Sequence, residues 1–206
     1  MNRIKIIVIA LILITSCSQT KNEADKLRYR NEEELLNHLF WELILPIQPC
    51  FQADTSMEYN ELYWSDFYTK LESSRHKIFF QPSLSEPKIS DFREIDLPYD
   101  FNQLYTNLFN DTTLKPRRFI PNPEKVIFKI DVITDFGIDS VQPDRFDSGN
   151  VLGLYEISRI SFNEDYSKAG FLLSTISSEE CNQLLLYFAE KQTNIWTINN
   201  KRIRLN

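Results

Sequence analysis

The stretch KAGFLLSTISSEECNQLLLYFAEKQTNIWTI, residues 168–198, decides the fold class of this chain. It opens on the apolar run Lys168–Thr175, which has the length and composition of a buried strand. The run Leu154–Phe162 precedes it across the polar turn Asn163-Glu164-Asp165-Tyr166. Two such runs around a short polar turn predict a pair of antiparallel strands.

The second half of this stretch permits two interpretations. Leu184–Lys191 leads through the polar turn Gln192-Thr193-Asn194 into Ile195–Ile198, as a β-hairpin does. The segment Ser177-Ser178-Glu179-Glu180 is also a helix-capping pattern, and apolar residues follow it at helical spacing at Cys181, Leu184, Leu185 and Phe188. Periodicity alone does not decide whether 177–191 is helix or strand. The polar turn that runs into an aromatic strand favours the strand.

Two more strands are expected upstream. Lys77–Phe80 is a short apolar run, and from residue 125 onward apolar side chains recur at every second position, at Val126, Phe128, Ile130 and Val132. The segment 81–99 holds three prolines and many charges and is expected to be mostly loop. An aspartate-rich loop is expected over 135–150.

A helix is expected to begin at Asn31, which has capping-box spacing to Glu34, and to stop at Pro46. Its apolar stripe is Leu35, Leu36, Leu39, Phe40 and Leu43. This spacing predicts an amphipathic helix that docks on a core.

Two further helices are expected from similar patterns. Thr55 and Glu58 precede a stripe of Tyr59, Leu62, Tyr63, Phe67 and Leu71, and Asp100 and Gln103 precede a shorter one of Leu104, Leu108 and Phe109. The sequence therefore predicts an α+β fold, with N-terminal amphipathic helices packed on a C-terminal meandering antiparallel sheet. Residues 31–206 are expected to form a single domain.

Composition limits the function classes. The chain has 206 residues, 42% hydrophobic and 25% charged, which is typical of one globular domain. The formal net charge of the whole chain is −6. Removal of residues 1–16 takes away Arg3 and Lys5, so the mature chain has 21 basic and 29 acidic residues and a net charge of −8. An acidic body disfavours binding to nucleic acid.

Residues 1–16 are predicted to be a signal peptide. Arg3 and Lys5 precede the apolar run Ile6–Ile14, which is too short to span a bilayer. The segment Ile14-Thr15-Ser16-Cys17 resembles the lipobox of bacterial lipoproteins. This resemblance implies cleavage before Cys17 and lipidation of Cys17 with a diacylglycerol and a further acyl chain, which would anchor the protein in the membrane.

Residues 17–30 are polar and charged, and are expected to form a flexible tether between the lipid and the domain. Ser18 and Gln19 follow Cys17 and are not aspartates, which by resemblance to well-studied sorting systems favours the outer membrane over the inner one. Cys50 and Cys181 would mature in an oxidising compartment, and the sequence leaves open whether they pair.

Little in the sequence points to catalysis, and no cofactor or metal site is expected. His38 and His76 belong to no metal or nucleophile motif, and each is expected to be solvated or locally hydrogen-bonded. Asp135, Asp139, Asp144 and Asp147 could gather around calcium, but their spacing does not fit an EF-hand loop, and a solvated acidic loop is the commoner outcome. A carboxylate-dependent hydrolase remains an alternative, with candidate groups at Asp91, Glu94, Asp96, Glu156 and Asp165.

Aromatic and basic groups are candidate binding surfaces. The aromatic residues Tyr59, Tyr63, Trp64 and Tyr68 suit either a sugar-stacking surface or the packed side of a helix, and packing is the commoner role. The basic groups are Lys115, Arg117 and Arg118 and the tail Lys201–Arg204, and both are too small to predict nucleic-acid binding.

A C-terminal pattern adds a family resemblance. Ser158–Asn163, then Asp165, Lys168 and Ala169, then the turn Glu190–Trp196 resemble a hairpin module of uncharacterised secreted lipoproteins of Gram-negative bacteria. The resemblance implies an α+β domain and no known activity. We therefore expect a lipid-anchored binding module that meets a protein or another envelope component, with an envelope hydrolase acting on glycan or peptidoglycan as the alternative.

Overall fold

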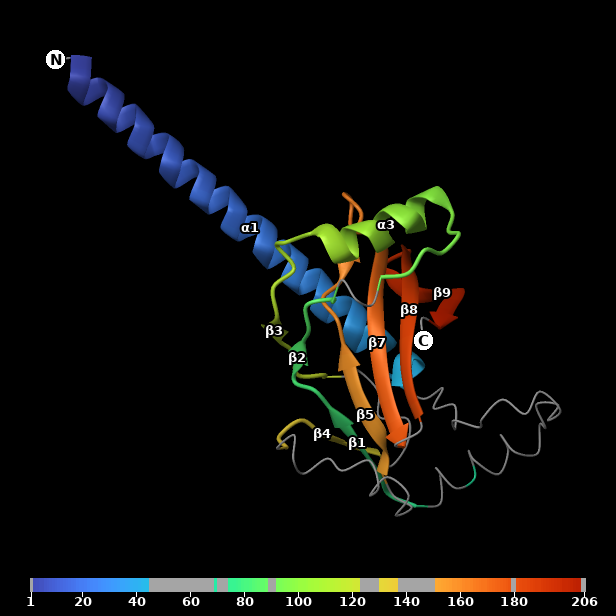
Figure 1. Cartoon of the computed structure of the whole chain (residues 1–206). Helices are drawn as coiled ribbons and strands as arrows, with labels where there is room; N and C mark the ends of the chain where they lie inside the picture. The colour runs from blue at the N-terminus through green and yellow to red at the C-terminus, as the bar shows by residue number, and fades with distance from the viewer. Residues whose placement is uncertain are drawn as a thin grey trace. The chain divides into compact units, whose positions relative to one another are not determined.

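The computed structural model describes residues 2–44, 69, 74–88, 92–122, 130–136, 151–178 and 181–204. Its elements are α1 (Asn2–Ile44), β1 (His76–Phe80), β2 (Ser83–Leu84), α3 (Tyr99–Asn110), β3 (Arg117–Arg118), β4 (Ile130–Ile133), β5 (Val151–Ile157), β6 (Ser161–Phe162), β7 (Lys168–Ser178), β8 (Cys181–Gln192) and β9 (Ile195–Arg204) (Figure 1). The chain divides into two compact units, Met1–Leu35 and Leu36–Asn206. The core and the pocket described below belong to the second unit.

The second unit is built on a large mixed sheet with the strand order β4-β1-β5-β7-β8-β9, in which β6 also pairs with β7. Strands β5, β7, β8 and β9 pair antiparallel, so the predicted C-terminal meander and the α+β class are confirmed. Residues 181–191 lie in β8, which confirms the strand interpretation of that segment.

One part of the sheet differs from the expectation of a purely antiparallel meander. Strand β1 lies between β4 and β5 and is parallel to both. Parallel neighbours need long connections, and β1 is separated from β4 and β5 by about 50 residues or more of chain. Local turn patterns carry no information on such distant pairing.

Helix α3 covers one face of the sheet, where β7 and β8 lie side by side (Figure 1). Phe101 packs against Phe188 of β8 with ring centroids 4.7 Å apart. The buried cluster on this face comprises Phe101, Leu104, Tyr105, Leu108, Leu114, Leu172, Leu186 and Phe188. A Cβ atom on Gly170 would lie 3.2 Å from the Phe188 ring and 3.4 Å from the Leu104 Cβ. The absence of a side chain at Gly170 therefore lets the helix approach the strand closely.

The C-terminal turns of α1 pack in the core on the opposite face. Phe40 contacts Phe80 of β1 at 5.6 Å between ring centroids, and the Tyr155 hydroxyl donates to the Ile44 carbonyl at 3.4 Å. Burial, with a smaller contribution from Tyr187, raises the pKa of Tyr155. The predicted stripe residues Leu36, Leu39, Phe40 and Leu43 are all buried.

Strands β5 and β6 were expected as one strand over Leu154–Phe162, and the structure interrupts it at Ser158–Ile160. The Ser158 hydroxyl accepts the Leu172 N–H at 2.9 Å and donates to the Arg159 carbonyl at 2.7 Å. Arg159 is only 1% exposed, and its guanidinium donates to the Lys115 carbonyl. The Arg159 side chain therefore lies in the interior at this interruption and binds the backbone just before β3.

Two predicted helix starts are wrong. Helix α1 begins at Asn2, and Asn31 lies inside it with its side-chain amide donating to the Leu27 carbonyl at 2.8 Å. Residues 2–44 contain no glycine or proline, so nothing in this sequence stops the helix before Asn31. Helix α3 is preceded by Pro98 without a side-chain cap, so Asp100 and Gln103 do not form the cap that their spacing suggested.

Residues 17–30 lie within α1, and the division of the chain into signal peptide, tether and domain stays a prediction. In the part of the chain that the structure describes, no helix has the length and apolar character needed to cross a bilayer. Three predicted features lie outside the described residues. They are the aromatic residues of the helix expected after Thr55, the alternating positions Val126 and Phe128, and Cys50.

Candidate functional site

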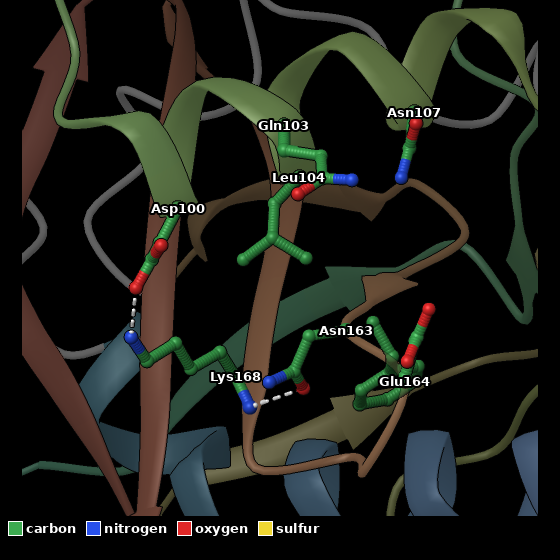
Figure 2. Close-up of a pocket in the computed structure, with 8 residues that line it drawn as sticks. Asp100, Gln103, Leu104, Asn107, Asn163, Glu164 and Lys168 are labelled. Atoms are coloured by element: carbon green, nitrogen blue, oxygen red, sulfur yellow. Dashed lines mark hydrogen bonds and ion pairs between the residues drawn. The ribbon is translucent and has the colours of Figure 1, made fainter.

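A pocket of about 320 Å³ opens between α3 and the turn that joins β6 to β7. Its lining residues are Asp100, Gln103, Leu104 and Asn107 of α3, Phe162 of β6, Asn163 and Glu164 of the turn, and Lys168 of β7. Figure 2 shows Gln103 and Asn107 extending from α3, with Asn163 and Glu164 on the turn across the pocket. The site is therefore formed by elements that are far apart in sequence.

The α3 residues that line the pocket lie on one side of the helix. Asp100, Gln103, Leu104 and Asn107 recur at i, i+3, i+4 and i+7 and share one side of the helix. Leu104 is buried against the sheet, whereas the three polar residues are exposed. The pocket therefore lies along the border between the buried and the solvated sides of α3.

Side-chain hydrogen bonds fix the opposite wall. The Asn163 Oδ1 accepts from the backbone N–H of Ser167 at 3.0 Å and from that of Lys168 at 2.8 Å, and its Nδ2 donates to the Ser167 Oγ at 3.0 Å. Tyr166 adopts a positive φ of 57°, as one residue of such a tight turn does. The turn is thus held in one shape by its own polar groups.

Asp165 strengthens the same turn from outside the pocket. Its Oδ1 accepts from the Ser167 Oγ at 2.6 Å and from the Ser167 N–H at 3.0 Å. These hydrogen bonds favour the ionised carboxylate and lower the pKa of Asp165.

An ion pair joins the two walls. The Lys168 Nζ lies 2.5 Å from the Asp100 Oδ2, and it also lies 5.9 Å from the centroid of the Phe101 ring. The hydrogen bond to the Asp100 carboxylate raises the pKa of Lys168. Both groups are partly exposed, so the pair positions the helix relative to β7 more than it stabilises the fold.

Aromatic rings support the β6 side of the pocket. Phe162 lies 5.2 Å from Tyr166 and 6.0 Å from Trp196 between ring centroids. Trp196 is buried under the Lys191 ammonium, which is 5.5 Å from its ring. The indole Nε1 has no hydrogen-bond acceptor among the described residues.

The histidines behave as expected in the described part of the chain. His38 is exposed on α1, and His76 is buried in β1 with its Nε2 2.8 Å from the Ser74 Oγ. Within the described ranges no group of three or more His, Cys, Asp or Glu side chains is arranged to hold a metal ion. Asp135 is exposed, whereas Asp139, Asp144 and Asp147, like Asp91, lie outside these ranges.

The structure does not bring the predicted carboxylate candidates together. Glu94 and Asp96 are exposed in the segment before α3, and Glu156 is half-buried in β5 opposite Ser174. Asp165 neighbours the pocket without lining it. The carboxylates that do line it, Asp100 and Glu164, were assigned from sequence to a helix cap and a turn.

The basic groups stay separate from the pocket. Lys115 pairs with Glu86 at 3.4 Å on an exposed surface, and Arg117 and Arg118 form β3. Lys201–Arg204 continue β9, and their side chains lie outside the description.

Comparisons with protein-family models, with curated proteins and with solved structures give no match for this chain.

Proposed function

We propose that this protein is a lipid-anchored cell-envelope protein that acts as a binding module, and that the pocket between α3 and the β6–β7 turn is its binding site. The observation that carries the binding role is the construction of this pocket. Two walls from distant parts of the chain are held by the Asp100–Lys168 ion pair and by the Asn163 hydrogen bonds, and Gln103, Asn107 and Glu164 stay exposed along the same lining. Preformed walls lower the cost of ordering a site when a ligand binds.

The anchoring part of the proposal rests on the sequence Ile14-Thr15-Ser16-Cys17 and its resemblance to a lipobox. An acylated Cys17 would hold the protein at the membrane, with the outer membrane favoured by Ser18 and Gln19. The ligand is then an envelope component, either a protein or a glycan-containing molecule. The acidic mature chain argues against nucleic acid.

Binding without hydrolysis fits the carboxylates of the pocket best. A hydrolase of this kind needs one carboxyl that stays protonated to donate a proton and a second at a defined separation. The Asp100 carboxylate is already engaged by the Lys168 ammonium at 2.5 Å. The neighbouring Asp165 has a lowered pKa, the opposite of what a general acid requires.

The test combines anchoring with pocket-dependent capture. The full-length protein and its Cys17→Ala variant are produced in a Gram-negative host, and we expect only the former to carry lipid by mass spectrometry and to sediment with membranes. The lipidated protein is then used as bait in solubilised envelope, beside the double variants Gln103→Ala/Asn107→Ala in the pocket and Asn102→Ala/Asn110→Ala elsewhere on α3.

We expect the wild type and the Asn102→Ala/Asn110→Ala control to retain the same envelope protein or glycan, and the pocket variant to lose it. Retention that is equal in all three would refute the pocket as the binding site. Membrane association that persists in the Cys17→Ala variant would refute the lipid anchor.

A further inference from the structure

We propose that the ligand of this pocket is a neutral saccharide unit; this inference deepens the proposed function and rests on it. A saccharide presents hydroxyl groups that both donate and accept hydrogen bonds, on a ring with apolar C–H faces. The pocket offers a matching set of amides, carboxylates and apolar carbon on its two walls.

The strongest argument is the pair of amides on α3. Gln103 and Asn107 are one helical turn apart, which places their Cβ atoms about 5–6 Å from each other. Both side chains are exposed, extend into the pocket in Figure 2, and have no hydrogen-bond partner among the described residues. Each amide has a carbonyl oxygen that accepts and an NH₂ that donates, so a single side chain can bind two adjacent hydroxyls.

The charged groups disfavour an anionic ligand. Among the described residues, Lys168 is the only cation that lines the pocket, and the Asp100 carboxylate already neutralises it at 2.5 Å. Glu164 adds a second carboxylate on the turn, so the lining carries a formal charge of −1. A carboxylate accepts hydrogen bonds from neutral hydroxyls and repels phosphates, carboxylates and other anions.

The apolar part of the lining suits the C–H face of a sugar. In the described part of the chain, Leu104 and Phe162 are the two apolar residues that line the pocket, one on each wall. The contacts of Phe162 with Tyr166 and Trp196 restrict its ring, so it forms a fixed surface on which a sugar ring can pack. A volume of about 320 Å³ is at the lower end of the range for small-ligand pockets, which indicates a short oligosaccharide segment.

The test uses defined probes and matched variants. The full-length lipidated protein in a sugar-free polyoxyethylene detergent is titrated with cellotriose, maltotriose and chitotriose, and with trigalacturonate as an anionic saccharide, by saturation-transfer NMR. We expect at least one neutral trisaccharide to bind the wild type and to exceed trigalacturonate in affinity.

The matched variants locate the binding. Gln103→Ala/Asn107→Ala should weaken the affinity by about tenfold or more, because two direct hydrogen bonds are lost. Asn102→Ala/Asn110→Ala removes two exposed amides from the same helix outside the pocket and should leave affinity unchanged. Circular dichroism confirms that both variants fold, and the single variants replace the double one if it does not.

Absence of binding by all three neutral trisaccharides, or binding that the pocket variant leaves unchanged, would overturn the saccharide inference. If envelope material is still captured in a pocket-dependent way, the binding module stands and only the ligand class is wrong. If neither saccharide nor envelope material depends on the pocket, the proposed function fails as well.

Discussion

Ser158→Ala tests how the interrupted strand is held. The Ser158 hydroxyl is buried, accepts the Leu172 N–H at 2.9 Å, and donates to the Arg159 carbonyl at 2.7 Å. Alanine leaves the Leu172 N–H without this acceptor, at a cost of about 1–3 kcal/mol, and loss of the second bond adds about 1 kcal/mol. We expect the free energy of unfolding to fall by about 2–4 kcal/mol. With a urea m value of about 2 kcal/mol/M, the midpoint should fall by about 1–2 M.

Urea unfolding followed by circular dichroism measures this loss, and amide hydrogen exchange reports on the Leu172 N–H directly. The control is Ser174→Ala. Ser174 is half-buried in β7, the strand that contains Leu172, and its side chain makes no hydrogen bond among the described residues. A loss under about 0.5 kcal/mol with an unchanged m value, or a Leu172 amide that exchanges as slowly as in the wild type, would show that the hydroxyl does not hold the interruption.

Three further results are expected. Leu108→Ala, which truncates a buried residue of the α3 cluster, should lower stability by about 2–5 kcal/mol in urea unfolding, and a change below 1 kcal/mol would mean that α3 is not packed on the sheet. A double-mutant cycle of Asp100→Ala and Lys168→Ala should give a coupling energy of only about 0.2–1 kcal/mol that decreases in 1 M salt, because both groups are partly exposed. Because the pKa of Asp165 is lowered in the folded state, its stabilising effect is present above about pH 4 and is lost as the pH falls through the folded-state pKa. Asp165→Asn should therefore flatten the pH dependence of the free energy of unfolding between about pH 5 and 2. An unchanged pH profile would contradict this.

The part of the fold that could be predicted is the part in which neighbours in sequence are neighbours in space. The turn at Thr193-Asn194, where both residues have positive φ, joins β8 to β9 as the polar triplet at 192–194 predicted. The apolar runs on either side of this turn predicted β8 and β9, because apolar residues in such runs are buried in a sheet. Pairing of β1 with β5 gives no such local pattern, so it could not be found from the sequence.

The pocket was missed for a related reason. Asp100, Gln103 and Asn107 form a polar line beside the apolar stripe of α3, and this line is visible in the sequence. Solvated helices carry such lines routinely, so this one indicates a site only when Asn163 and Glu164 are seen to face it. That juxtaposition depends on α3 lying against β6 and β7, which is a tertiary contact.

The alternation of β7 links the core to the site. Lys168, Gly170 and Leu172 point toward α3, whereas Ala169 and Phe171 point to the other face, where Phe171 stacks on Tyr187. A slip of one residue in this strand would turn every side chain to the opposite face. Lys168 would then leave Asp100, and Gly170 would no longer allow the close approach of Leu104. The register that buries Leu172 and Phe171 on opposite faces is therefore the same register that brings Lys168 to Asp100, so the position of the pocket follows from the packing of the core.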